Sequence, residues 1–166
     1  APRQTEETIA ARPQVTRHAT PTPAATAQRR VQGSTRHAMR LLLQHPELVA
    51  NTPDVERLEA LEDPDVPLLL QLVTQLRQSP HTSLGAVLGY WYGTESGELL
   101  ARLAAEAPPP DTDPQREFED VIEHLVQRAT RKTATEQLRE LERIAFVELS
   151  PAQKQQYLQL LQLRKK

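Results

Sequence analysis

From residue 34 to the end of the chain, apolar residues recur three or four positions apart, which is the spacing of one face of an α-helix. The stretch 66–79 is a clear example, because its leucines and valines keep this spacing and Pro80, which cannot continue a helix, follows directly. No stretch alternates apolar and polar residues as a half-buried β-strand requires. The pattern therefore predicts an all-α fold of about seven or eight helices joined by short loops.

Capping residues and prolines predict where the helices begin and end. Helix starts are expected at Ser34 or Thr35, at Pro46, at Pro53, after Asp65, at Thr82 or Ser83, and at Ser96. The triple proline 108–110 stops the last of these helices. Gly85 and Gly89 would share one helix face and let a neighbouring backbone approach closely.

The longest predicted helix covers about 113–147, and its apolar face is interrupted midway. The face is apolar from Phe118 to Ala129, almost wholly polar over 130–137, and apolar again from Leu138. A helix with such an interruption is expected to leave one packed body and enter another.

The final helix, expected over 151–164, has more apolar residues than one helical face can hold. These residues are Tyr157, Leu158, Leu160, Leu161 and Leu163. A hairpin with the preceding helix buries one face, and each leucine left in water forgoes about 1.5–3 kcal/mol of burial. Either this helix packs back onto the rest of the chain, or its surplus side chains, flanked by Lys165, form a surface that a partner covers.

These patterns divide the chain into three parts. Residues 1–33 hold four prolines and few large aliphatic residues, so they cannot bury enough apolar area to offset the entropy of ordering. We expect a flexible Pro- and Arg-rich linker, disordered or weakly helical, whose arginines could contact nucleic acid or simply keep a tether soluble. Residues 34–130 form the predicted bundle and residues 131–166 the predicted hairpin.

The amino-acid composition excludes several kinds of protein and site. The 166 residues include no cysteine, which excludes disulfides and thiolate metal sites and fits a reducing cytosol. No apolar run approaches the roughly 18 residues that cross a bilayer, so we expect a cytoplasmic protein without membrane contact. The chain starts at Ala1 rather than Met, which suggests a piece of a longer protein.

The residue types and spacings that carry catalysis are missing. The five histidines lack the spacing of metal ligands, and no glycine-rich phosphate loop occurs. Asp63-Pro64-Asp65 could hold Mg²⁺ in another setting, but here it precedes a helix start and predicts a turn. We therefore expect no catalytic residue, no metal site and no cofactor.

Three motifs, in their order and spacing, carry a resemblance to a known family. They are Leu41–Leu48 (LLLQHPEL), Gly85–Leu88 with Trp91–Thr94, and Leu99–Leu103. Over about 34–166 the chain resembles the C-terminal domain of bacterial DnaG-type primases. The resemblance implies a helical bundle followed by a protruding C-terminal hairpin, in a non-catalytic fragment of a DNA primase, the RNA polymerase that makes primers.

The resemblance also implies two partners. The first is the hexameric DnaB-type replicative helicase, which the hairpin would bind through Tyr157, Leu158, Leu160, Leu161, Leu163 and Lys165. The second is the acidic C-terminal tail of single-stranded DNA-binding protein, in a bundle pocket at positions Ser34, Thr35, Arg36, Met39 and Arg102. There Arg36 and Arg102 would supply positive charge for an anionic tail, and Met39 an apolar wall.

Two other functions compete with this interpretation. The N-terminal domain of the helicase itself has a similar architecture, but the proline-rich front segment and the final two lysines argue against it. A helical nucleic-acid-binding module needs a basic face. However, residues 34–166 sum to about −5 after the +3 of residues 1–33 is removed from the total of −2. Little or no direct DNA binding is therefore expected from the folded part.

Overall fold

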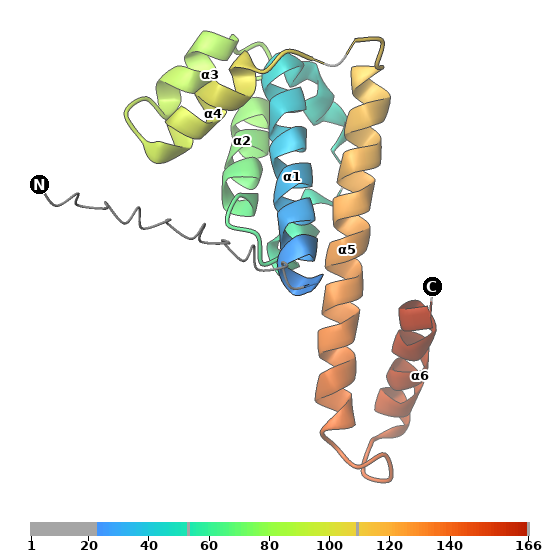
Figure 1. The fold of residues 1–166 in the computed structure, drawn as a ribbon. Coiled ribbons are helices and arrows are strands. Elements are labelled where there is room, and N and C mark those ends of the chain that lie inside the picture. The colour runs from blue at the N-terminus through green and yellow to red at the C-terminus, as the bar shows by residue number, and fades with distance from the viewer. Residues whose placement is uncertain (1–22, 53, 109, 166) are drawn as a thin grey trace, which may run out of the picture.

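The computed structural model describes residues 23–52, 54–108 and 110–165, and over these residues it contains six α-helices, two 3-10 helices and no strand. The elements are α1 (Pro23–Gln44), η1 (Pro46–Asn51), η2 (Val55–Ala60), α2 (Val66–Gln78), α3 (Leu84–Tyr90), α4 (Glu95–Ala105), α5 (Pro114–Glu142) and α6 (Pro151–Lys165). The predicted all-α fold is confirmed (Figure 1).

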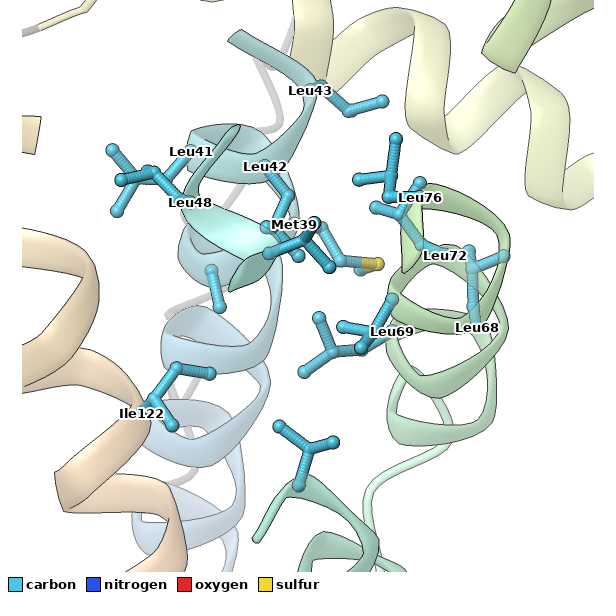
Figure 2. Close-up of a cluster of buried hydrophobic side chains, with 14 of the residues drawn as sticks. Met39, Leu41, Leu42, Leu43, Leu48, Leu68, Leu69, Leu72, Leu76 and Ile122 are labelled. Atoms are coloured by element: carbon cyan, nitrogen blue, oxygen red, sulfur yellow. The ribbon is translucent and has the colours of Figure 1, made fainter. Parts of the chain in front are cut away.

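Helix α1 lies at the centre of the bundle, between α2 and the upper half of α5 (Figure 1). Over residues 38–43 its apolar side chains are buried, with Met39 and Leu42 inaccessible to solvent. Figure 2 shows Met39 directed toward Leu69 and Leu72 of α2. Each such buried side chain contributes about 1.5–3 kcal/mol of hydrophobic stabilisation, so this cluster holds the bundle together.

Several helix starts follow the predicted capping chemistry. The Ser83 hydroxyl accepts a hydrogen bond from the Ala86 amide at 3.3 Å at the start of α3. Helix α4 begins at Glu95 rather than Ser96, because the Thr94 hydroxyl caps it and accepts from the Gly97 amide at 3.0 Å. Asp65 precedes α2 as expected but makes no side-chain cap bond, since its carboxylate pairs with the Arg36 guanidinium at 2.6 Å instead.

Two expectations about the bundle are wrong. Helix α1 already includes residues 23–33, so it does not begin at Ser34 or Thr35 as expected. The close approach expected at Gly85 and Gly89 occurs at Gly97 instead, where an added Cβ would lie 2.1 Å from the Trp91 carbonyl oxygen. Gly85 and Gly89 are exposed, with open space around them.

The apolar side chains of the described residues form two separate clusters. The bundle cluster ends along α5 at Ala129, and the second cluster begins on the same helix at Ala134. Between them, Lys132 reaches Glu62 of the bundle at 2.9 Å and Glu136 of its own helix at 3.7 Å. Helix α5 thus runs out of the bundle, and α6 folds back along its lower half (Figure 1).

Candidate protein-docking surfaces

The hairpin of α5 and α6 has a small core of its own. Its buried members are Ala134, Leu138, Leu141, Leu149 and Leu160, with Tyr157 and Leu161 packed against them. Of the residues expected to bind the helicase, Leu160 is therefore misassigned: it is only 6% exposed, because it faces α5. Tyr157 and Leu161 are half-buried in the same interface.

The other expected docking residues lie on the outside of the hairpin. Leu158 is 55% exposed and Leu163 49% exposed, and Lys165 is also exposed. Within the described chain, one face of α6 is covered by α5 and the other is open to solvent. Leu158 and Leu163 are therefore apolar residues of α6 that the hairpin leaves exposed, as the sequence predicted.

A larger apolar exposure occurs in the loop that joins the two helices, and the sequence reasoning missed it. The predicted helix 113–147 ends at Glu142, which places Ile144, Phe146 and Val147 in a loop rather than on a helix face. Val147 is 87% exposed and Phe146 is 54% exposed, and Ile144 is exposed as well. We call Ile144, Phe146 and Val147 the tip patch.

Specific contacts fix the conformation of this loop. The Phe146 ring packs edge-on against the Tyr157 ring with centroids 5.9 Å apart, and the Lys154 ammonium lies 5.4 Å from the Phe146 ring centre. Leu149 is buried in the hairpin core and anchors the end of the loop. The tip patch is therefore presented by a braced loop, at the end of the molecule farthest from the bundle (Figure 1).

A reciprocal cap also fixes the entry into α6. The Ser150 hydroxyl accepts from the Gln153 amide at 3.3 Å, while the Gln153 side-chain oxygen accepts from the Ser150 amide at 2.9 Å. This is a capping box, and its signature of Ser followed three positions later by Gln is visible in the sequence. It agrees with the helix start at residue 151 that the sequence predicted.

A second candidate surface is a basic cavity of about 280 Å³ between α1 and α4. Arg36 and Arg102, both expected at the site for an acidic tail, line this cavity together with Arg40 and His37. Arg36 is paired with Asp65 at 2.6 Å and Arg40 with Glu106 at 3.3 Å. Among the described residues, Arg102 has no carboxylate partner: it donates to the Glu98 carbonyl oxygen, at 3.4 Å, and lines the cavity.

The remaining residues expected at that pocket do not share one location. Thr35 and Met39 are fully buried, so the structure corrects their assignment as pocket walls. The Thr35 hydroxyl donates to the Asp63 carboxylate at 2.5 Å, and Met39 fills the space between α1 and α2. Ser34 is partly buried on α1. Arg40 and His37 were missed, although they follow Arg36 and Gly33 by four positions on the same helix face.

Two kinds of feature are absent from the described residues. In that part of the chain no helix is long and apolar enough to cross a membrane. Residues 23–52, 54–108 and 110–165 also contain no cluster of three or more His, Asp or Glu side chains suited to a metal ion.

Comparison with known proteins gives consistent matches. The family model described as DNA primase DnaG DnaB-binding matches residues 35–160. The DNA primase of Pseudomonas aeruginosa is 29% identical over 125 residues, which cover 75% of this chain and 19% of the relative. A DNA primase of Pseudomonas putida is 33% identical over 132 residues, covering 79% of this chain and 20% of the relative.

A solved structure matches as well. The DnaG primase C-terminal domain from Vibrio cholerae superposes with a TM-score of 0.57 at 25% identity, covering 77% of this chain and 96% of that chain. The chain spans about a fifth of the length of the curated relatives it matches.

Proposed function

Because this chain belongs to the DnaG DnaB-binding family, we propose that it docks a DNA primase onto a hexameric DnaB-type replicative helicase, so that primers are made where the fork opens. The family is the helicase-binding part of primase and not its catalytic part. On this proposal the longer protein is the RNA polymerase that makes primers, working in the cytoplasm at the replication fork.

The observation that carries the proposal is the tip patch. A braced loop presents Phe146 and Val147 to solvent, although burying each such side chain is worth about 1.5–3 kcal/mol. A partner that covers them gains this energy. Because the loop is already ordered, binding loses little conformational entropy, which favours affinity. We infer that the tip patch, with Leu158, Leu163 and Lys165, forms the helicase-docking surface, while Tyr157, Leu160 and Leu161 hold the hairpin in shape.

We infer that the two ends of α5 have different roles, one in the bundle and the other in the docking hairpin. The bundle over 34–130 and the hairpin over 131–166 have separate hydrophobic clusters, which change over between Ala129 and Ala134. The hairpin can therefore be altered at its tip without disturbing the bundle. Residues 1–22 lie outside the described part of the chain, and their role as a tether to the polymerase domain stays a prediction.

A single substitution tests the docking surface. Val147→Asp places a carboxylate where an apolar contact is proposed, and Tyr92→Asp is the matched control, because Tyr92 is 90% exposed on the bundle. Helicase binding by Val147→Asp should weaken at least about tenfold, since stranding a charge in an apolar interface costs more than 1.4 kcal/mol. Circular dichroism should show both variants folded. If a folded Val147→Asp variant binds the helicase as tightly as wild type, the tip patch is not part of the docking surface.

We also propose that the basic cavity between α1 and α4 binds the acidic tail of single-stranded DNA-binding protein. The convergence of Arg36, Arg40 and Arg102 on one cavity supports it, because guanidinium groups pair well with carboxylates. Arg102→Glu is the cleaner test, since Arg36 also holds Asp65. Calorimetric titration with the tail peptide should show a loss of about tenfold or more, and Arg139→Glu, on α5, should bind normally. Equal affinity of both variants would exclude the cavity.

The folded part should bind DNA weakly or not at all. Residues 34–166 carry a formal charge of about −5, obtained from the total of −2 and the +3 of residues 1–33. A duplex repels such a surface, so any affinity should come from residues 1–33 and fall steeply with salt.

A further inference from the structure

A groove with an apolar floor runs along α5 on the side of η1 and η2. It is a hollow of about 690 Å³, with Ile122 and Val126 of α5 and Ala50 of η1 among the apolar residues that line it. Its polar lining includes Asp54, Glu119 and Glu123. We call this hollow the α5 groove.

The charged side chains that line the α5 groove are all acidic, and one cation, the Arg77 guanidinium, contacts the groove through Thr52, to whose carbonyl and hydroxyl oxygens it donates. No Lys, Arg or His is among the described residues that line it. Glu119 and Glu123 accept hydrogen bonds at 3.0 Å only from neutral Gln115 and Gln127, and neither is in an ion pair with another described residue. Asp54 has only a distant pairing with Arg57, at 3.8 Å. The groove therefore favours an occupant that is both apolar and positively charged.

The face of α5 that lines the groove continues along the helix toward the docking hairpin. Its α5 positions are continued along the same helix face by Thr130, Thr133 and Gln137. These residues line a second hollow of about 380 Å³, together with Glu56 and Arg57 of η2 and Leu160 and Leu163 of α6. A partner that covers the exposed Leu163 therefore lies beside this second hollow.

We propose that the α5 groove is a second contact for the helicase, and that it takes a basic amphipathic helix of that partner. Apolar side chains three or four residues apart on this helix lie over Ile122 and Val126, and flanking Lys or Arg side chains reach Asp54, Glu119 and Glu123. The inference rests on the proposed docking function and extends its surface from the hairpin to the bundle.

The two contacts act on different steps of binding. Exposed charges at the rim of an interface steer the approach of a partner, so they alter the association rate and its dependence on salt. Buried apolar contacts such as the tip patch chiefly set the dissociation rate. The rates can therefore separate a contact at the groove from a contact at the tip.

The test measures helicase association and dissociation by biolayer interferometry, using the full chain and the hexameric helicase, at about 50 mM and about 300 mM salt. Glu119→Lys/Glu123→Lys reverses the groove charge, and Glu95→Lys/Glu98→Lys makes the same charge change on exposed positions of α4. The groove variant should associate about tenfold more slowly than wild type at low salt and nearly normally at high salt. The α4 variant should change much less, and Glu119→Gln/Glu123→Gln should give an intermediate loss.

The other possible results of this experiment each contradict a specific part of the proposal. If the groove variants associate normally while Val147→Asp loses binding, the groove is not a contact and the docking function stands. If the wild-type chain itself does not bind the helicase, the docking function fails and the inference fails with it. If sedimentation shows a wild-type dimer that the groove variant converts to a monomer, the occupant is a second copy of this chain and not the helicase.

Discussion

Gly97 lies where α4 crosses the turn after α3, and Gly97→Ala should destabilise the bundle. A Cβ at this position would lie 2.1 Å from the Trp91 carbonyl oxygen and 2.9 Å from its carbonyl carbon. Ordinary contact begins at 3.4 Å, so the two backbones must separate by about 1.3 Å (3.4 minus 2.1). Because both partners are backbone, no side chain can rotate away to relieve the overlap.

The magnitude follows from what this separation disturbs. Overpacking a tight contact costs about 1–3 kcal/mol. The Trp91 carbonyl oxygen also accepts from the Thr94 amide at 3.1 Å and from the Thr94 hydroxyl at 2.7 Å, and weakening these bonds adds about 0.5–1.5 kcal/mol. The total is about 1.5–4.5 kcal/mol, which lowers Tm by about 3–18 °C in a chain of this size.

Differential scanning calorimetry checks the prediction, with Gly89→Ala as the matched control. Gly89 lies in α3 with nothing within 4 Å of an added Cβ, so alanine there should stabilise its helix. The expected gain is up to about 1 kcal/mol, or up to about 4 °C in Tm. The two substitutions should therefore shift Tm in opposite directions. An unchanged Tm for Gly97→Ala would refute the reasoning about the Trp91 contact.

Two further substitutions test the packing and the hairpin cap. Met39→Ala should lower the free energy of unfolding by about 2–5 kcal/mol, because it leaves a cavity between α1 and α2. Chemical denaturation measures this change, and a loss below about 1 kcal/mol would show that Met39 is not a core residue. Ser150→Ala should cost about 1 kcal/mol and speed amide exchange in the first turn of α6, because it removes the capping hydroxyl; unchanged exchange in that turn would contradict the capping box.

The helical periodicity of the sequence was sufficient to predict the fold class, but it did not predict where every helix begins and ends. The four-residue cluster of Leu68, Leu69, Leu72 and Val73 faces the core in the structure as the pattern requires. The start of α1 was missed because apolar content was used to recognise it. A helix can extend beyond its buried part without apolar residues, and α1 already runs through residues 23–33.

The tip patch could not be read from periodicity. Ile144 continues the apolar spacing of α5, and no Gly or Pro marks the end of that helix at Glu142. The chain leaves the helix there, and Leu149 enters the hairpin core instead. Which of several apolar residues anchors a loop depends on the packing of two helices, and spacing along one chain does not determine it.

The pocket residues show what a resemblance can and cannot transfer. It brought Arg36 and Arg102 to one cavity, since charge at the surface depends mainly on residue type and position. It failed for Thr35 and Met39, whose burial depends on how α1 faces α2 and the Asp63 turn in this chain. Side-chain orientation requires the packed structure.

Hydroxyl-radical footprinting of Phe146, with and without the DnaB-type helicase, asks whether another protein covers the hairpin tip. Phe146 is 54% exposed in the free chain, and Tyr92, at 90%, serves as the internal reference on the bundle. Oxidation of Phe146 should fall severalfold in the complex, while that of Tyr92 stays constant. If Phe146 is oxidised equally in the free and the bound protein, the helicase does not dock on this loop.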